Sequence, residues 1–277
     1  MAASDVKLVG AWVSPFVTRP RIALNLKAVE YEFLEEVIGT KSELLLKSNP
    51  VYKKIPVLLH RDRPICESLI ILEYIDDTWT SGPSILPSDP YDRAIARFWG
   101  CYIEDKIFPN LGRIATSWGR DVEAIEQIKT AIEMLEKAFK DCSKGNDFFN
   151  GDQIGYLDIA LGCHLGWLRA LETMHGFKAM DEEKTPGLAG WAERFLAHEA
   201  VKDVDPKVGR LIEFAHEGFS SPSRTNRRAC GRRFPSSSLP LRPSMQNREG
   251  ERRRRAIGRG RGGPSREEDE QNRREVD

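Results

Sequence analysis

One serine near the N-terminus has the sequence surroundings of a reactive hydroxyl. Ser14 follows an apolar run at residues 6–11 and precedes an amphipathic run at residues 21–29, which predicts a strand, a tight turn and a helix. Serine is favoured at a helix N-cap, and Pro15 suits the first helical position. A helix start offers unpaired N–H groups and partial positive charge, so a hydroxyl there can donate to a bound thiolate or phosphate. Alternatively, Ser14 only caps its helix.

The segments that follow Ser14 predict a small mixed sheet. Strands are expected at residues 31–36, 57–60 and 64–66, the last two forming a β-hairpin. Helices are expected at residues 41–48 and 69–79, with Ser68 as the cap of the second. A strand, helix and strand joined this tightly should be parallel with a right-handed crossover. The order βαβ and then ββα predicts a thioredoxin-like domain at residues 1–80, with ligand sites at the strand ends beside the first helix.

A second, all-helical domain is expected at residues 91–219, after a linker rich in Pro, Ser and Gly at residues 81–90. One of its segments, residues 154–171, is apolar nearly all round and predicts a single buried central helix. Gly155 fits the cap of that helix, with Asp158 in its first turn. The predicted fold class is therefore α+β/α, a thioredoxin-like domain followed by a helical one.

The net charge of zero is the sum of two segments with opposite net charges. Residues 220–277 contain 16 arginines, no lysine and 8 acidic residues, a net charge of +8, which leaves −8 on residues 1–219. With 9 hydrophobic residues among its 58, the last segment cannot bury enough apolar surface to offset the entropy of ordering. We therefore expect an Arg-rich disordered tail at residues 220–277. Three interpretations of this tail stay open: an alternative reading of a gene, an arm that binds nucleic acid weakly, and a nuclear address.

Composition also excludes several classes of protein. No run of 18 apolar residues occurs, so no transmembrane helix is expected, and the first residues lack a signal-peptide pattern, so the expected location is cytoplasmic. The five cysteines show no C-x-x-C spacing, which favours reduced thiols over disulfides or a metal site.

Six stretches, taken together, resemble the soluble glutathione transferases, and within them the plant tau class. In chain order they are WVSPFVTRPRIAL, KSELLLKSNPVYKKIPVLLH, PICESLIILEYIDDTW, DQIGYLDIALG, GWLRALE and DEEKTPGLAGWAERF. The resemblance implies an enzyme of detoxification and stress response that joins the thiolate of glutathione to hydrophobic electrophiles. Glutathione is then a co-substrate, and no cofactor or metal is implied. Neither a membrane nor a nucleic-acid partner is expected, apart from weak binding by the tail.

The resemblance also gives roles to individual residues that bind glutathione. Lys41 and Lys54 match the positions that hold its glycine end, and Ile55 precedes a proline that resembles the family's cis-proline and pairs with the cysteinyl backbone. Glu67 and Ser68 match the acidic-serine pair for the γ-glutamyl end. Taken alone, the lysines would be interpreted as solvated charges and Ser68 as a helix cap.

Ser14 matches the family's thiol-activating serine. A thiol has a pKa of about 8.5, a hydrogen bond to a charged group contributes about 1.5–3 kcal/mol, and a helix start adds about 0.3–1 kcal/mol. Together these lower the thiol pKa by about one to three units, which makes most bound glutathione a thiolate near neutral pH. Serine in place of cysteine disfavours thiol–disulfide exchange. A non-catalytic carrier of hydrophobic ligands in the same cleft stays the alternative function.

By the same resemblance an electrophile pocket is expected between the domains, lined by Trp12, Phe16, Ile38, Phe108, Trp167 and Phe214. An aromatic stripe is more often core than pocket, so a packing role is the alternative. Three departures bear on this pocket. Pro20 predicts a kink or a late start of the first helix, Gly112 and Ala115 predict a wider pocket, and the chain after Phe214 predicts a shortened last helix.

The resemblance further implies a homodimer. Charged contacts between its subunits are expected from Asp76 or Asp77 and from Arg93 or Arg97, because opposite charges flank the linker.

Overall fold

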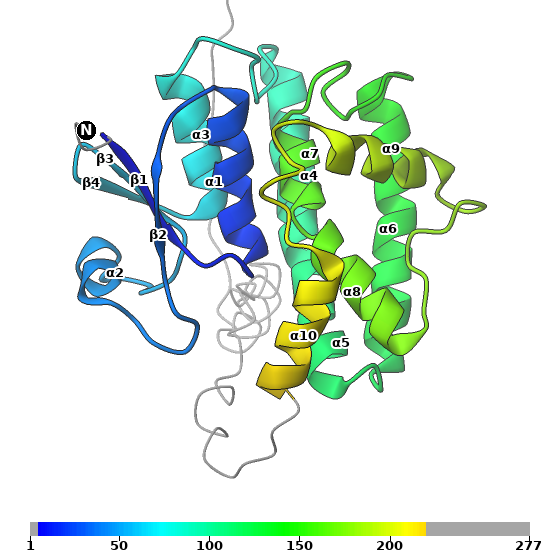
Figure 1. Ribbon diagram of the computed structural model, residues 1–277. Coiled ribbons are helices and arrows are strands. Elements are labelled where there is room, and N and C mark those ends of the chain that lie inside the picture. The colour runs from blue at the N-terminus through cyan, green and yellow to red at the C-terminus, as the bar shows by residue number, and fades with distance from the viewer. Residues whose placement is uncertain (1–4, 220–277) are drawn as a thin grey trace, which may run out of the picture. The chain divides into compact units, whose positions relative to one another are not determined.

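The computed structural model describes residues 5–219, and Figure 1 shows their arrangement. The predicted disordered tail at residues 220–277 lies outside the described residues. The N-terminal part contains β1 (Val6–Gly10), α1 (Pro15–Leu26), β2 (Glu32–Glu35), α2 (Glu43–Ser48), β3 (Val57–His60), β4 (Arg63–Cys66) and α3 (Ser68–Thr78). The helical part contains α4 (Pro90–Lys106), α5 (Phe108–Ser117), α6 (Val122–Ser143), α7 (Tyr156–Gly162), α8 (Leu165–His175), α9 (Pro186–Ala197) and α10 (Val208–Phe219). The two-part fold predicted from the sequence is confirmed.

The sheet has the order β2-β1-β3-β4, with β1 parallel to β2 and both other pairs antiparallel. Successive side chains of a strand face opposite sides, and neighbouring buried residues accordingly belong to different core clusters. Leu8 and Leu58 belong to the main core with α1 and α3, whereas Val9 and Val57 form a smaller cluster with Leu45 of α2. Figure 1 accordingly shows α1 and α3 on one side of the sheet and α2 on the other.

The first helix begins where the sequence predicts, at Pro15 with Ser14 as its N-cap. The expected late start is wrong, because α1 runs from Pro15 to Leu26 with Pro20 inside it. Pro20 lacks an N–H group, so the carbonyl of Phe16 has no α-helical donor from that position.

The third helix is capped differently from the prediction. Glu67, at φ 71°, is the N-cap, and Ser68 is the first residue of α3. The Ser68 side chain is buried, and its hydroxyl oxygen accepts a hydrogen bond from Arg19 instead of capping the helix. A contact between distant residues therefore replaces the local cap.

The predicted central helix is in fact two helices, α7 and α8. The amide of His164 donates to the carbonyl of Leu161 and not to that of Ala160. The carbonyl of Ala160 accepts instead from Nη2 of Arg19 at 2.9 Å. The helix is thus interrupted where Arg19 of the N-terminal domain donates to a carbonyl that would otherwise accept a helical N–H. The start of α7 agrees with the prediction, since the Asp158 carboxylate accepts the N–H of Gly155 at 2.9 Å.

The linker is fastened to α3 by Asp76. Its two carboxylate oxygens accept the N–H groups of Ile85 and Leu86, each at 2.9 Å, and Lys27 Nζ lies 2.7 Å from Oδ1. Both charged side chains of the pair are nearly buried. Of the two aspartates predicted for the intersubunit contact, Asp76 is therefore used within the chain, and Asp77 stays a prediction.

Candidate active site

Ser14 lies half-buried in the turn between β1 and α1, and its hydroxyl forms no hydrogen bond with another residue of the range 5–219. Its N–H donates to the carbonyl of Ala11 at 3.0 Å, and its own carbonyl accepts the N–H of Val17 at 3.0 Å and of Thr18 at 3.2 Å. The side chain makes no capping hydrogen bond. The backbone of Ser14 is thus fixed by the first turn of α1, while the hydroxyl is left for a ligand at the helix start. This geometry disfavours a role for Ser14 as a cap alone.

Three predicted pocket residues meet beside this turn. The rings of Trp12 and Phe214 are 5.8 Å apart edge to face, and those of Trp167 and Phe214 are 6.4 Å apart. Trp167 Nε1 also donates to the carbonyl of Val13 at 2.9 Å. These contacts join the loop between β1 and α1 to α8 and α10, which are labelled in Figure 1.

Two further predicted residues meet on the other side of the turn. The Phe16 and Phe108 rings are 4.5 Å apart, and the imidazole of His164 lies 5.9 Å from the first and 6.1 Å from the second. Ile38 stands apart from both aromatic groups. It is 53% exposed in the loop between β2 and α2 and belongs to none of the apolar clusters formed by the described residues.

The predicted glutathione residues differ in how far the protein itself uses them. Lys41, Lys54 and Glu67 are exposed, and their side chains form no ion pair with another residue of the described range 5–219. Ile55 is half-buried, and its bond to the following proline is cis, as the resemblance predicts. Glu67 occupies the left-handed region, which is unusual for a residue with a side chain, and such conformations are most frequent at functional sites. Two cations and one carboxylate are therefore available to a charged ligand.

Arg19 is a residue that the sequence analysis missed. Its side chain is fully buried, and its guanidinium spans the two domains. Nη1 donates to Ser68 Oγ at 3.0 Å, Nη2 lies 2.5 Å from Glu104 Oε1, and Nε donates to Cys163 Sγ at 3.2 Å. Burying a charge is tolerated only with a partner and a full set of hydrogen bonds. Arg19 therefore holds the start of α3 against α4 and α7.

The neighbours of Arg19 are uncharged apart from Glu104. Burial raises the pKa of the Cys163 thiol to about 11, so this cysteine stays protonated near neutral pH. Burial and the adjacent guanidinium hold the pKa of His164 well below its usual range. His164 Nε2, which lies 3.2 Å from Arg19 Nη2, is then an acceptor, and the neutral ring packs on Phe16 and Phe108.

Helical periodicity carries a signal for Arg19. The positions three and four residues further on, Ile22 and Ala23, are buried, so Arg19 lies on the buried face of an amphipathic helix. An arginine on such a face requires a carboxylate partner. The partner itself, 85 residues away in α4, is not visible from any local pattern.

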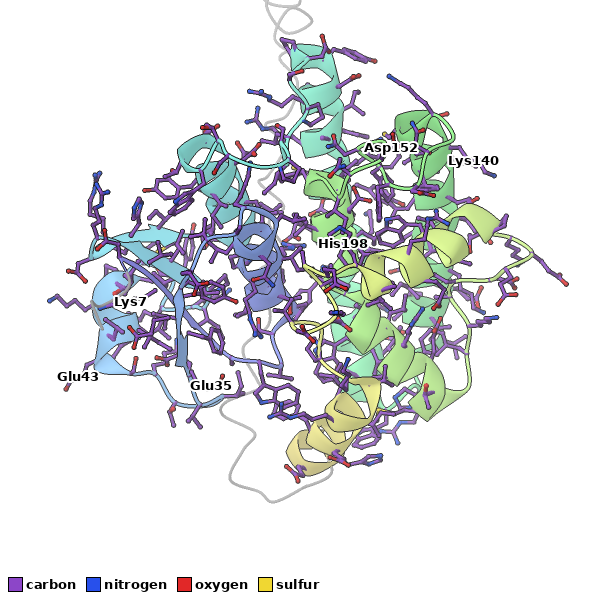
Figure 2. All side chains as sticks on the ribbon, turned by 45° about the horizontal axis from the view of Figure 1, so that its top comes forward. Lys7, Glu35, Glu43, Lys140, Asp152 and His198 are labelled. Carbon is purple, nitrogen blue, oxygen red and sulfur yellow. The ribbon has the colours of Figure 1, made fainter. Side chains whose placement is uncertain are left out.

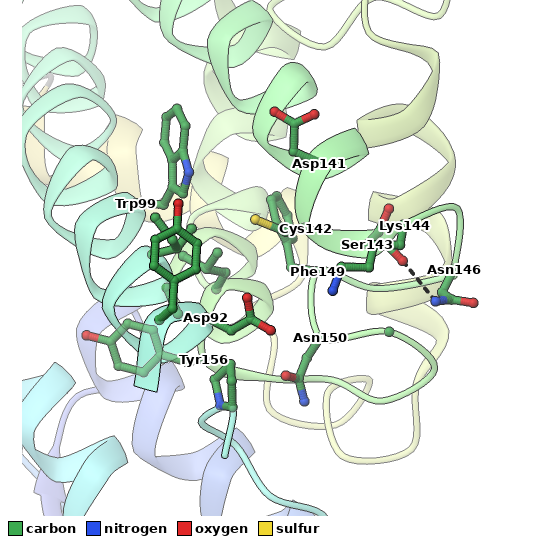
Figure 3. A pocket seen from close by; sticks show the side chains of 16 residues that line it. Asp92, Trp99, Asp141, Cys142, Ser143, Lys144, Asn146, Phe149, Asn150 and Tyr156 are labelled. Atoms are coloured by element: carbon green, nitrogen blue, oxygen red, sulfur yellow. Dashed lines mark hydrogen bonds between the residues drawn. The ribbon is translucent and has the colours of Figure 1, made fainter. Parts of the chain in front are cut away.

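A separate hollow lies in the helical domain and holds none of the predicted site residues. It encloses about 550 Å³ between the first half of α4, the end of α6 and the loop before α7. Figure 3 shows Trp99 and Tyr156 on one side of it and Asp141, Asn146 and Asn150 on the other. This hollow is distinct from the surroundings of Ser14. Within residues 5–219, no group of three or more His, Cys, Asp or Glu residues is placed to hold a metal ion, and no helix is long and apolar enough to cross a membrane.

Two family models match the chain. The glutathione S-transferase N-terminal domain matches residues 4–77, and the glutathione S-transferase C-terminal domain matches residues 92–194. Together with the thioredoxin-like sheet, the helical domain and the serine at the start of α1, these matches show that the chain belongs to the glutathione S-transferase family. It is accordingly an enzyme, a glutathione transferase.

The relatives narrow the assignment to the tau class. The chain is 62% identical to glutathione S-transferase U17 of Arabidopsis thaliana over 225 residues, which cover 80% of this chain and 99% of the relative. It is 58% identical to a tau-class enzyme of mango, Mangifera indica, with a TM-score of 0.74 over 76% of this chain and 97% of that one. It is 36% identical to a rice glutathione transferase solved in complex with glutathione, with a TM-score of 0.72 over 79% of this chain and 100% of that one.

Proposed function

We propose that this enzyme activates glutathione through the Ser14 hydroxyl and joins its sulfur to hydrophobic electrophiles. The observation that carries the proposal is the uncommitted hydroxyl at the N-terminus of α1. The hydroxyl donates to the thiolate, and the partial positive charge of the helix start adds to the stabilisation of this anion. The thiol proton leaves to solvent. The thiolate then attacks the electrophile, a C–S bond forms, and the leaving group departs with its electron pair.

The two ends of glutathione are held by opposite charges. Lys41 and Lys54 take the glycine carboxylate, for which two unpaired ammonium groups are suited. Glu67 takes the ammonium of the γ-glutamyl end, and Ser68, fixed by Arg19, takes its carboxylate at the start of α3. The backbone of Ile55 pairs with the cysteinyl residue as a short added strand. Glutathione is the co-substrate, and no further cofactor takes part.

The electrophile lies against the aromatic residues on both sides of Ser14. These residues are Trp12, Phe16, Phe108, Trp167 and Phe214, with Ile38 at the margin. Their half-buried rings leave apolar surface beside the sulfur, which favours a hydrophobic substrate. Detoxification and stress response in the cytoplasm are the roles that fit this chemistry.

A homodimer is also part of the proposal. Large apolar side chains are exposed along α3 and α4, with Ile70 at 58%, Tyr91 at 72% and Phe98 at 60%. Tyr91 and Phe98, seven residues apart, lie on one face of α4, and this exposed apolar surface fits a contact with a second copy. Light scattering at micromolar concentration is expected to give the mass of two chains, and the mass of one chain would overturn this part.

Turnover separates the enzyme from its alternative, a carrier that uses the same residues. Purified protein is mixed with glutathione and 1-chloro-2,4-dinitrobenzene, and the thioether product is followed with time. The proposal predicts product formation that saturates in both substrates and exceeds the uncatalysed rate. A protein that binds the aromatic halide without accelerating the reaction would be a carrier.

A further inference from the structure

Arg210 lies over the aromatic group beside Ser14. It is the third residue of α10, and its Cζ atom is 3.7 Å from the centre of the Trp12 ring. Phe214, one helical turn further along, contacts the same ring edge to face at 5.8 Å. The guanidinium is therefore held as a cation on the face of Trp12. Trp12 lies two residues before Ser14, the serine that is proposed to activate the thiol.

The N–H donors of Arg210 have no acceptor among residues 5–219. Its side chain is exposed, and within residues 5–219 it forms no hydrogen bond or ion pair with another residue. Some other arginines of the described chain are paired, as Arg19 with Glu104 and Arg97 with Glu73, and what sets Arg210 apart is that its unpaired guanidinium lies on the Trp12 ring. Glu35, at the end of β2 (Figure 2), lies beside Trp12, and its carboxylate accepts the backbone N–H of Trp12 at 3.1 Å. It forms no ion pair with Arg210. Arg210 thus presents a planar set of N–H donors whose position is fixed by stacking.

We infer that Arg210 makes this enzyme select electrophiles that carry an anionic group on an aromatic body. Guanidinium N–H groups match a carboxylate in two parallel hydrogen bonds, while the apolar body packs against Trp12 and Phe214. The two carboxylates of glutathione are already assigned to Lys41 and Lys54 and to Ser68, so Arg210 is left for the second substrate. The inference rests on the proposed function, and it adds a substrate class that hydrophobic residues alone do not distinguish.

The test compares two aryl chlorides that undergo the same substitution. One is 1-chloro-2,4-dinitrobenzene, which is neutral, and the other is 4-chloro-3,5-dinitrobenzoate, which carries a carboxylate. Arg210→Gln is expected to lower kcat/KM for the benzoate about tenfold and to change the neutral substrate less than twofold, because only the anion uses the guanidinium. In the unsubstituted enzyme saturated with glutathione, added salt should slow the benzoate reaction more than the neutral one, and this difference should disappear in Arg210→Gln.

Lys207→Gln is the matched control. It removes the same charge three residues earlier, where Lys207 Nζ lies 3.2 Å from the carbonyl of Lys202 and contacts no aromatic ring among the described residues. Both substrates should keep their kcat/KM within twofold in this variant. If kcat/KM falls equally for both substrates in Arg210→Gln, Arg210 only holds α10 on Trp12. If kcat/KM is unchanged for both substrates, the guanidinium does not contact the anion. Either result overturns the inference.

Binding distinguishes failure of the inference from failure of the proposed function. If the unsubstituted enzyme turns over neither chloride, the affinities for 3,5-dinitrobenzoate and 1,3-dinitrobenzene are measured by quenching of tryptophan fluorescence. A preference for the anion that is lost in Arg210→Gln supports the inference even then. The same affinity ratio in both proteins contradicts it.

Discussion

Arg19 Nη1 donates a hydrogen bond to Ser68 Oγ at 3.0 Å, across 49 positions of sequence. The bond joins the first helix, which starts at the proposed thiol site, to the start of α3, where the γ-glutamyl end is proposed to bind. The same guanidinium pairs with Glu104 of α4 and with the carbonyl of Ala160 of α7. One buried cation thus joins the two elements where the thiol and the γ-glutamyl end of glutathione are proposed to bind.

Arg19→Lys is expected to lower both stability and glutathione affinity. Lysine keeps the charge but cannot reach the five acceptors of the planar guanidinium, so Glu104 and the Ala160 carbonyl lose buried partners. Breaking a buried pair costs about 3–5 kcal/mol, so a loss of about 2–4 kcal/mol in the free energy of unfolding is expected for this partial change. Denaturant unfolding and calorimetric titration with glutathione measure the two effects.

Arg21→Lys, on the same helix, is the control for Arg19→Lys. Its guanidinium donates to Tyr31 Oη at 3.3 Å and stacks on Phe33, and its side chain is half-exposed. A loss below about 1 kcal/mol is expected there, as for other partly exposed contacts. Equal losses in the two variants would refute the special position of Arg19.

Glu67→Gln is expected to weaken glutathione binding without unfolding the protein. The exposed Glu67 carboxylate has no partner of opposite charge on the described chain, so stability should change by less than about 0.5 kcal/mol. A hydrogen bond between charged groups contributes about 1.5–3 kcal/mol, so the dissociation constant of glutathione should rise about 10- to 100-fold. Calorimetric titration measures it. The control is Glu133→Gln on α6, where the side chain is 49% exposed, and this variant should leave the affinity for glutathione unchanged. Unchanged affinity in Glu67→Gln would remove Glu67 from the site.

Asp205→Asn is expected to change the pH dependence of stability. Burial raises the pKa of the Asp205 carboxyl to about 6, although Lys207 and Arg169 act in the opposite direction, and Oδ1 has no hydrogen-bond partner among residues 5–219. The unfolded chain releases this proton near pH 3.9. The folded state therefore binds the proton more tightly, and this group's contribution to stability falls as the pH rises from about 4 to 6, by at most about 3 kcal/mol.

The comparison with the unsubstituted protein isolates that contribution. Denaturant unfolding at pH 8 should find Asp205→Asn more stable by about 1–3 kcal/mol, and the difference should be near zero at pH 4. A difference that is the same at both pH values would show that the carboxyl titrates normally.

Local signals predicted the parts of the fold that local interactions determine. The strand pattern, the position of Ser14 before Pro15 and the Gly155–Asp158 cap depend on residues within a few positions of one another. The errors occur where a distant partner overrides a local preference. Ser68 looked like a helix cap because its type favours that role, but Arg19 binds its hydroxyl oxygen, and the same arginine interrupts the central helix at Ala160.

The candidate site shows the same division. The resemblance predicts Ser14 and the aromatic residues, and five of the six predicted pocket residues form two clusters in the structure, while their roles stay predictions. Arg210 carried no sequence signal, because a charged residue at the start of a surface helix is typical of any solvated face. Its significance depends on the Trp12 ring, which lies 198 positions earlier in the chain.

The central claim is that Ser14 stabilises the thiolate of bound glutathione, and the thiol pKa of the complex tests it most directly. The ultraviolet absorbance of the thiolate is titrated between pH 5 and 10 in the unsubstituted enzyme and in Ser14→Ala, each saturated with glutathione. We expect an apparent thiol pKa about one to two units higher in Ser14→Ala, since the variant lacks the hydroxyl but keeps the helix start. Glutathione should still bind, and kcat/KM near pH 6.5 should fall by about tenfold for each unit. The same thiol pKa in both proteins, with comparable turnover from pH 6 to 8, would contradict the account.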